Sequence, residues 1–280
     1  MPATLYICAT PIGNLEDITL RVLRILKEAD LIAAEDTRNT LRLLNHFEIK
    51  NTLTSYHEFN KYDKADELVG LLLEGKSIAL VTDAGTPAIS DPGEVIVRKA
   101  IENGIPVTSL PGACALIDAL TISGQPTRRF AFEAFLPRDK KERTRVLTEL
   151  KNETRTIIIY EAPHHLKNTL KDLFESLGDR EISLCRELTK IHEERLIFKL
   201  SEAINYYNEN DPRGEYVLVI RGKSFEELET EARASWENME LNEHMQLYLD
   251  RGMDKKTAMK QVAKDRGISK REVYNLLLEK

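Results

Sequence analysis

Cysteine is scarce in this chain, and the cysteines that are present form no metal or redox motif. Cys8, Cys114 and Cys185 lie far apart, with no CxxC pair and no Cys/His cluster at zinc spacing. Each stands beside small or apolar residues, which is typical of buried, reduced thiols. The first residues show no basic stretch followed by an apolar one, and no apolar run approaches the roughly 20 residues of a membrane span. We therefore expect a cytoplasmic protein with no signal peptide, no membrane span and no metal site.

Basic residues are not in excess, and this limits the kind of partner. The formal net charge of the 280 residues is -6, which argues against attraction of nucleic acid by the whole surface but leaves room for a local basic patch. Hydrophobic residues make up 42% and charged residues 31%, as in ordinary globular proteins. At roughly 150 residues per domain, the length predicts two domains and a small appendage.

The common phosphate-binding loops are missing as well. The dinucleotide fingerprint GxGxxG does not occur, so another loop must hold any nucleotide-like cofactor. The segment from Gly70 to Ser77 fits the P-loop pattern GxxxxGK[ST], but a P-loop follows a strand and begins a helix. Here an amphipathic helix ends near Leu73 and a strand begins at Ser77. We conclude that this match is a coincidence.

Short β-rich runs alternate with amphipathic helical patterns in the first part of the chain, which predicts βαβ units and a mostly parallel sheet. The predicted strands are residues 5–9, 31–34, 77–82 and 107–110, and the predicted helices include 20–29, 64–73 and 94–103. The strands that follow are more closely spaced, which favours a mixed or largely antiparallel sheet. They are residues 130–135, 156–160, 181–186, 195–200 and 215–221, with a helix at 166–177. We predict an α/β protein with an N-terminal lobe (1–122), a C-terminal lobe (123–223) and a helical extension (224–280).

The extension differs from the lobes in charge and in pattern. Residues 224–250 contain eight acidic residues and one basic, whereas residues 251–280 contain four acidic residues and nine basic. Its end predicts two short amphipathic helices that break at Gly267, with Ser269 as the N-cap of the second. This spacing resembles a helix-turn-helix, and a small helical bundle that binds no nucleic acid is the alternative.

One loop, VTDAGTPAISDPG at residues 81–93, combines several features of a ligand site. Asp83 follows a buried strand, at the edge where ligands bind in open α/β sheets. Gly85 permits close approach of the backbone, two prolines stiffen the turn, and Asp91 is placed to cap a helix that Gly93 opens. A rigid turn without a ligand would also use glycine and proline. The two acidic residues together with the hydroxyl side chains exceed what such a turn requires, so we favour a ligand site.

Other loops of the same character follow further strands. In the N-terminal lobe they are TPIGN (10–14), EDTR (35–38) and PGAC (111–114), and in the C-terminal lobe EAPHH (161–165) and CRELTK (185–190). Glu161, Glu187 and Lys190 are either catalytic or members of a structural ion-pair set. His164 and His165 are adjacent and have no third ligand nearby in the sequence, so we expect no metal site there.

These motifs, in this order, resemble the ribosomal RNA small subunit methyltransferase I family of the tetrapyrrole methylase superfamily. The segments that carry the resemblance are ATPIGNLEDIT, AEDTR, SYHEFN, VTDAGTPAISDPG, LPGACA, FEAFLP, IIYEAPHH, CRELTK and GEYVLVI. They extend from about Thr4 to Ile220, and the extension is similar to one found in many members. His165 stands where members commonly have arginine, and Thr82 and Cys114 stand where serine is common.

The resemblance implies a two-lobed class III methyltransferase fold, usually in a homodimer, with S-adenosylmethionine between the lobes. The implied activity is methylation of the 2′-hydroxyl of a cytidine in 16S ribosomal RNA, at the decoding centre of the 30S subunit. Carried over by position, the cofactor contacts would be Pro11, Gly13, Asp83, Ala84, Gly85, Ala113, Cys114, Tyr160, Leu188, Val217 and Leu218.

This activity assigns roles to charged residues. A protonated 2′-hydroxyl is a poor nucleophile, so a nearby base should help, and Glu161 and Glu187 are the candidates, with Lys190 or Arg38 holding a phosphate. The candidate RNA contacts are Arg38, Arg42, Arg128, Arg129, Arg138, Lys140, Lys141 and Arg143. Any one of them is equally consistent with a solvated helix face.

Two rival functions belong to other classes. A methyltransferase of the same superfamily that acts on a small tetrapyrrole-type molecule would need a wide apolar cleft and no basic extension. A non-enzymatic RNA-binding protein would use the helical extension as its functional part and would bind no S-adenosylmethionine.

Overall fold

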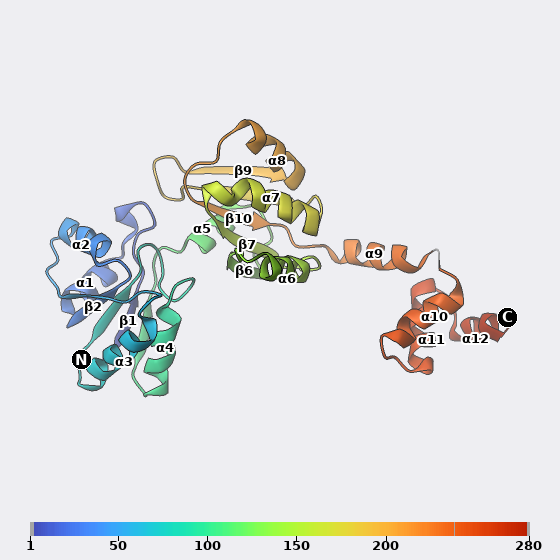
Figure 1. Ribbon diagram of the computed structural model, residues 1–280, viewed down its shortest axis with the longest axis horizontal. Helices are drawn as coiled ribbons and strands as arrows, with labels where there is room; N and C mark the ends of the chain where they lie inside the picture. The colour runs from blue at the N-terminus through green and yellow to red at the C-terminus, as the bar shows by residue number, and fades with distance from the viewer. Residues whose placement is uncertain (1–2, 238, 279–280) are drawn as a thin grey trace. The chain divides into compact units, whose positions relative to one another are not determined.

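The computed structural model describes residues 3–237 and 239–278. The chain forms two compact units, one that runs to Arg221 and one that starts at Gly222. The first unit contains two five-stranded sheets, each with helices on both faces (Figure 1). The predicted α/β class is confirmed. Within the described residues, no helix is long and apolar enough to cross a membrane.

The first sheet is entirely parallel, as the alternation of strands and helices predicted. Its strands are β1 (Leu5–Cys8), β2 (Leu31–Ala34), β3 (Leu53–Ser55), β4 (Ile78–Val81) and β5 (Val107–Leu110), in the order β3-β2-β4-β1-β5. All four residues of β4 are buried, because helices cover both faces of the sheet.

Helices pair up on the two faces of this sheet. α1 (Leu20–Glu28) and α2 (Thr37–His46) pack on one face, and α3 (Lys61–Leu73) and α4 (Gly93–Glu102) pack on the other. The chain therefore leaves β1 toward β2 but leaves the neighbouring β4 toward β5, on the opposite side. The connections after β1 and β4 therefore run to opposite sides of the sheet, and such a switch in strand order is where open α/β sheets bind ligands.

The segment that matches the P-loop pattern is the end of α3 and the turn into β4. The Gly75 N–H donates to the Leu72 carbonyl and the Lys76 N–H to the Leu71 carbonyl, and Gly75 has a φ of 98°. These groups close a helix C-terminus, so they do not face a phosphate. The predicted coincidence is confirmed.

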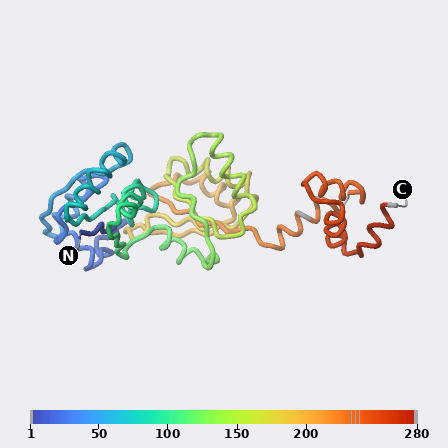
Figure 2. The backbone as a smooth tube through the Cα atoms, turned by 90° about the horizontal axis from the view of Figure 1, so that it is seen from below, coloured from blue at the N-terminus to red at the C-terminus, as the bar shows by residue number. Residues whose placement is uncertain are grey.

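The second sheet is mixed, as predicted. Its strands are β6 (Phe130–Phe135), β7 (Thr156–Glu161), β8 (Glu181–Arg186), β9 (Glu194–Lys199) and β10 (Tyr216–Ile220), in the order β6-β7-β10-β8-β9. Only the β6–β7 pair is parallel. Figure 2 shows that the backbone completes the first sheet, coloured blue to green, before it enters the second.

Helices also cover the second sheet on both faces. α6 (Lys140–Leu150), α7 (Pro163–Leu177) and α8 (Leu200–Glu209) pack on one face. α5 (Ala115–Ile122) packs on the other, where Leu116 and Leu120 meet Ile158 and Val217. α5 therefore lies before the predicted boundary between the lobes in sequence, yet it packs on the second sheet. α7 begins earlier than the predicted residue 166, because Pro163 occupies its first turn, a position that suits proline.

The second compact unit is helical. It consists of α9 (Phe225–Glu237), α10 (Leu241–Asp250), α11 (Lys255–Arg266) and α12 (Lys270–Leu278), and the last three pack around Met245, Met259, Val262 and Val273. Gly267 ends α11 with a φ of 65°. The Ser269 hydroxyl accepts a hydrogen bond from the Glu272 N–H at 3.2 Å, and the Glu272 carboxylate accepts one from the Ser269 N–H at 2.6 Å. The predicted break at Gly267 and the predicted cap at Ser269 are confirmed.

Candidate active site

The loop after β4, residues 82–92, is held from four sides. The Thr10 and Gly85 backbones exchange two hydrogen bonds, of 2.9 and 3.0 Å. The Thr86 hydroxyl donates to the Ala113 carbonyl at 2.9 Å, and the Thr82 hydroxyl donates to a Glu35 oxygen at 2.6 Å. The Tyr56 hydroxyl, from the SYHEFN motif, donates to the Pro92 carbonyl at 2.8 Å. Because its partners come from four other segments, the loop is fixed before any ligand binds.

Asp91 stabilises the turn at the end of this loop. The predicted N-cap assignment is wrong in position, because Pro92 occupies the cap of α4. The Asp91 carboxylate instead accepts hydrogen bonds from the N–H groups of Ala88 at 2.9 Å and Gly93 at 2.8 Å. A Cβ atom at Gly93 would lie 2.7 Å from an Asp91 oxygen, so this close turn requires glycine. Burial raises the pKa of Asp91.

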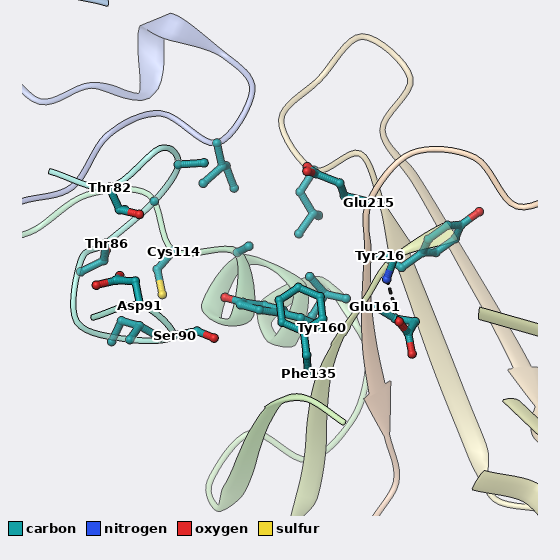
Figure 3. A pocket seen from close by; sticks show the side chains of 18 of the residues that line it. Thr82, Thr86, Ser90, Asp91, Cys114, Phe135, Tyr160, Glu161, Glu215 and Tyr216 are labelled. Atoms are coloured by element: carbon teal, nitrogen blue, oxygen red, sulfur yellow. Dashed lines mark hydrogen bonds between the residues drawn. The ribbon is translucent and has the colours of Figure 1, made fainter. Parts of the chain in front are cut away.

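A pocket of about 440 Å³ lies against this loop. Residues of the first lobe and of the second lobe both line it, and Figure 3 shows Thr82, Thr86, Asp91 and Cys114 on one side and Tyr160, Glu161 and Glu215 on the other. Its walls are Ile12, Glu35, Thr82, Ala84, Gly85, Thr86, Ile89, Ser90, Asp91, Cys114, Ala115, Phe135, Tyr160, Glu161, Ala162, Pro163, Leu188, Lys190, Glu215, Tyr216 and Val217. The volume is within the range of about 300–1,000 Å³ usual for small-molecule sites.

The predicted cofactor residues do not all line this pocket. Six of them line it, namely Ala84, Gly85, Cys114, Tyr160, Leu188 and Val217. Pro11, Gly13 and Asp83 line a neighbouring pocket that shares Thr82 with the first. Ala113 contributes the carbonyl that Thr86 contacts. The Leu218 side chain is fully buried in the cluster on the opposite face of β10, because successive side chains of a strand alternate.

The neighbouring pocket has a volume of about 390 Å³ and lies between the loop after β1 and α2. Arg42 and His46 of α2 line it, as do Asn39 and Asp83. An Asp83 oxygen accepts a hydrogen bond from the Asp36 N–H at 3.1 Å. Burial and the nearby Glu35 carboxylate raise the pKa of Asp83. Arg42 makes no ion pair with any residue that the structure describes, so its charge is available in this pocket.

Tyr160 forms part of an aromatic wall. Its hydroxyl accepts a hydrogen bond from the Leu116 N–H at 3.2 Å. Burial raises its pKa to about 12, so the phenol is uncharged at neutral pH. The Phe132 ring lies 4.9 Å and the Phe135 ring 5.7 Å from it, both in edge-to-face arrangements. This wall offers an apolar surface with one hydroxyl, which suits a flat heterocycle.

Glu161 is the last residue of β7 and is only 6% exposed. One oxygen accepts a hydrogen bond from the Ala162 N–H at 2.8 Å, and the other accepts one from the Thr169 hydroxyl. Arg143 donates to the same Thr169 hydroxyl at 2.8 Å and pairs with Asp172 at 2.7 Å. This network orients the carboxylate at the pocket wall, and it engages Arg143, one of the candidate RNA contacts.

Lys190 joins two carboxylates at the other side of the pocket. Its Nζ lies 2.9 Å from Glu187 Oε1 and 2.9 Å from Glu215 Oε2. Burial disfavours the charged ammonium, but these two hydrogen bonds outweigh it and raise the pKa of Lys190. Burial raises the pKa of Glu187, whereas the hydrogen bonds from Lys190 and from the Glu215 N–H lower it. Together these hydrogen bonds have the larger effect, so the pKa of Glu187 lies below its ordinary value. Lys190 and Glu215 line the pocket, and Glu187 does not.

The backbone of this second loop is strained. Glu187 and Thr189 have φ values of 51° and 64°, in the left-handed region that residues with side chains rarely adopt. The buried Thr189 Oγ1 has no hydrogen-bond partner among the described residues. A Cβ atom at Gly13 would lie 2.3 Å from Lys190 Cγ, so the loop after β1 touches the loop after β8 here. Strain of this kind gathers at functional sites, where the surrounding structure holds it in place.

The candidate RNA residues are mostly exposed. Arg38 is bound to Asp36 at 2.6 Å, and this hydrogen-bonded pair lowers the pKa of Asp36 to about 2. Arg42 lines the second pocket. The remaining exposed ones are Arg128, Arg129, Arg138, Lys140 and Lys141. Within residues 3–237 and 239–278, no three His, Cys, Asp or Glu side chains are placed to hold a metal ion.

Two pocket residues carry functional groups that sequence reasoning did not single out. Phe135 stands in the FEAFLP motif, but an irregularity in β6 decides which way it points. Glu215 comes at the start of β10, whose antiparallel pairing places it beside the carboxyl ends of β7 and β8. The polar residue before an apolar strand was a usable signal for Glu215, because antiparallel strands begin where their neighbours end.

Solved structures with this architecture include a diphthine synthase and several methyltransferases. Diphthine synthase matches with a TM-score of 0.63 at 15% identity, over 81% of this chain and 94% of that one. Uroporphyrin-III-C-methyltransferase from Thermus thermophilus matches with a TM-score of 0.55 at 20% identity, over 78% and 94%. At these identities the likeness concerns the fold, and it confirms the two-lobed class III methyltransferase fold.

Sequence relatives are much more similar. The family model of tetrapyrrole (corrin/porphyrin) methylases matches residues 4–204. The ribosomal RNA small subunit methyltransferase I of Halalkalibacterium halodurans is 51% identical over 98% of this chain and 94% of its own length. The chain belongs to the ribosomal RNA small subunit methyltransferase I family. The member from Bacillus subtilis is 48% identical over 97% of this chain, and the member from Thermotoga maritima is 49% identical over 78% of this chain and 98% of its own length.

The pocket fits S-adenosylmethionine, the cofactor of this methyltransferase family. Its lining has four carboxylates, Glu35, Asp91, Glu161 and Glu215, against one ammonium, Lys190, which is already paired. This excess of negative charge favours a ligand that carries a sulfonium and an amino group. The aromatic wall at Tyr160 and the close-packed glycine loop supply an apolar slot for a heterocycle. The resident residues are therefore suited to hold this cofactor.

Proposed function

We propose that this protein methylates the 2′-hydroxyl of a cytidine in 16S ribosomal RNA, at the decoding centre of the 30S subunit. The observation that carries the proposal is the pocket at the switch point of the first sheet, whose walls come from both lobes and suit a cationic cofactor. The names of relatives that are 45–51% identical over nearly the whole chain support the RNA substrate. We further propose that it works in the cytoplasm as a homodimer.

Four of the chain's groups would govern the reaction. When bound, S-adenosylmethionine supplies a methyl group activated by its sulfonium. The carboxylates of Asp91 and Glu35 favour the cationic cofactor, and Tyr160 closes one wall against water. Glu161, oriented by Ala162 and Thr169, accepts the proton of the ribose hydroxyl through a lone pair that these contacts leave free.

Lys190 and Glu187 would take part in binding of the substrate rather than in proton transfer. The pKa of Glu187 lies below its ordinary value, so its carboxylate is a weaker base than an ordinary glutamate. Its contact with Lys190 instead holds the ammonium at the pocket wall, where a phosphate of the RNA can approach. We therefore assign proton transfer to Glu161 and phosphate binding to Lys190, with Glu187 as its positioning partner.

The proposed function is tested with 30S subunits that lack the modification. The purified protein is incubated with these subunits and S-adenosylmethionine labelled in its methyl group, and the modified nucleotide is mapped by primer extension at low nucleotide concentration. Label on a ribose 2′-oxygen of a decoding-centre cytidine is the expected result. Absence of label from 16S RNA, or label on a base, would contradict the proposal. Sedimentation equilibrium checks the homodimer separately.

The role of Glu161 is tested with Glu161→Gln. Glutamine keeps the shape of the side chain and can still accept from Ala162 and pair with Thr169, but it is not a base. We expect methyl transfer to fall by about 100-fold or more, with the dissociation constant for S-adenosylmethionine changed far less. Thr169→Val is the comparison variant, because it removes the orienting hydroxyl and leaves the carboxylate, so it should lower methyl transfer less than Glu161→Gln does. If E161Q keeps near wild-type activity, Glu161 is not the base.

A further inference from the structure

Phe135 presents an open aromatic face at the active-site pocket. The residue lines the pocket and is 57% exposed, although an exposed aromatic ring is unfavourable in water. Its neighbours in the aromatic wall differ, since Tyr160 and Phe132 are only partly exposed and pack in the core cluster under α5. Figure 3 shows the Phe135 and Tyr160 side chains next to each other. Phe135 is thus the member of this wall that solvent, or a ligand entering from solvent, meets first.

A bulge in β6 is what turns Phe135 toward the pocket. Phe132 pairs with Ile158, but the next pair is Phe135 with Tyr160, so β6 has one residue more than β7 between them. Side chains alternate along a strand, so in a regular strand with no bulge Phe135, three residues after Phe132, would point to the opposite face from Phe132. Because of the bulge, Phe132 and Phe135 lie on the same face of β6, and both rings contact the ring of Tyr160.

The bulge is maintained at a cost in backbone strain. Ala134 within it has a φ of 50°, in the left-handed region that alanine disfavours. Ala134 belongs to a set of strained residues beside this pocket, with Ala88, Glu187 and Thr189. Strain that aims an aromatic ring at solvent contributes nothing to the core, so it points to a ligand for the ring.

A nucleobase is the ligand class that fits this ring. A nucleotide whose ribose is to be methylated must leave its stacked neighbours to enter the pocket, and unstacked RNA bases are commonly stacked on aromatic side chains. We propose that Phe135 is the stacking platform for the base of the methylated nucleotide. This inference rests on the proposed function, and it assigns the base to the mouth of the pocket and the cofactor to the deeper walls at Gly85, Cys114 and Val217.

The test compares Phe135→Leu with Phe135→Trp. The leucine keeps the apolar character but offers no flat face, and we expect kcat/KM for unmodified 30S subunits to fall by about 5- to 150-fold, since stacking of a base on an aromatic side chain contributes about 1–3 kcal/mol. The dissociation constant for S-adenosylmethionine, measured by calorimetry, should stay within about twofold of wild type. The tryptophan should retain activity close to wild type.

The matched control is Phe130→Leu, which makes the same change at the other end of β6, at a residue that is 37% exposed and does not line the pocket. Thermal melts of all variants show whether each one is folded. If the wild type is active and Phe135→Leu has the same kcat/KM as the wild type, the inference is overturned and the proposed function remains intact. A loss of S-adenosylmethionine affinity as large as the loss of kcat/KM would assign Phe135 to the cofactor and also overturn it. An inactive wild type would contradict the proposed function itself.

Discussion

Lys190 and Glu215 form an ion pair at 2.9 Å across the second sheet, although 25 residues separate them in the chain. Lys190 follows β8 and Glu215 precedes β10, and the antiparallel pairing of these strands brings the two loops together. The ammonium is thereby fixed between Glu215 and Glu187 at the wall of the pocket. Its position depends on the sheet, and its charge is partly neutralised before RNA arrives.

Lys190→Met should have little effect on stability and a large effect on activity. The three charged side chains are partly exposed, so removal of the ammonium should change the free energy of unfolding by about 1 kcal/mol or less. The rate of methyl transfer to 30S subunits should fall by more than about tenfold, because a phosphate contact and the setting of the loop are lost together. Lys167→Met is the matched control, since Lys167 pairs with Asp211 at 3.2 Å away from the pocket. Similar activity for the two variants would contradict the assigned role.

The ion pair between Lys190 and Glu187 predicts a pH dependence of stability. The pKa of Glu187 in the folded protein lies below its ordinary value of 4.5, so its ionised form stabilises the fold above that pH. This stabilisation is lost as the pH falls from 4.5 through the lowered pKa. The difference in melting temperature between wild type and Lys190→Met should therefore be constant from pH 6 to pH 7 and shrink below about pH 4.5. A difference that grows on acidification would show that Lys190 does not stabilise the Glu187 carboxylate.

Gly13→Ala should disturb the contact between the two lobes' loops. The new methyl group would lie 2.3 Å from Lys190 Cγ and 3.2 Å from the Leu188 carbonyl oxygen, so Lys190 must move. We expect a loss of about 1–3 kcal/mol in the free energy of unfolding and a larger proportional loss of methyl transfer. Gly70→Ala is the control, because Gly70 lies inside α3 with no atom within 4 Å of a new Cβ. That variant should be more stable by about 0.5–1 kcal/mol and equally active.

The sequence predicted the architecture and a rigid loop after β4 better than it predicted the individual contacts of that loop. The run IALV, continued by TDAGTPAISDPG, predicted a buried strand and a rigid loop at its end, because burial on both faces and glycine-proline turns are local properties. The partners that hold this loop, Tyr56 and Glu35, come from other segments and become visible only when the strands are ordered in the sheet.

Differences between the expected cofactor residues and the pocket lining have physical reasons of the same kind. The resemblance implies both Val217 and Leu218 at the cofactor, yet successive side chains alternate along β10, and only Val217 lines the pocket. This alternation can be read from the sequence. The orientation of Phe135 was not, because a one-residue bulge reverses the face on which every later side chain lies.

Arg42→Ala should weaken RNA binding through charge alone. Arg42 lines the second pocket without an ion pair among the described residues, so its guanidinium is free to neutralise a phosphate. The affinity for 30S subunits should fall, and the slope of log K against log salt concentration should decrease by about 0.7–0.9. Arg24→Ala is the control, because Arg24 is paired with Glu28 on α1 at 2.7 Å. An unchanged slope for the Arg42 variant would remove this residue from the RNA surface.

The helical extension offers the last test, because its two interpretations predict different results. α12 begins at Lys270 behind the Ser269 cap, and Lys270, Arg271 and Tyr274 are exposed while Val273 lies in the core. In a helix-turn-helix the start of the second helix contacts nucleic acid, and an exposed aromatic ring beside basic residues suits RNA. The double variant Lys270→Glu, Arg271→Glu should therefore weaken binding of 30S subunits and lower the salt slope by about 1.4–1.8, with S-adenosylmethionine binding unchanged. The variant Lys255→Glu, Lys256→Glu makes the same charge change at the start of α11 and should have a smaller effect. Equal binding by both variants and wild type would identify the extension as a helical bundle that does not bind RNA.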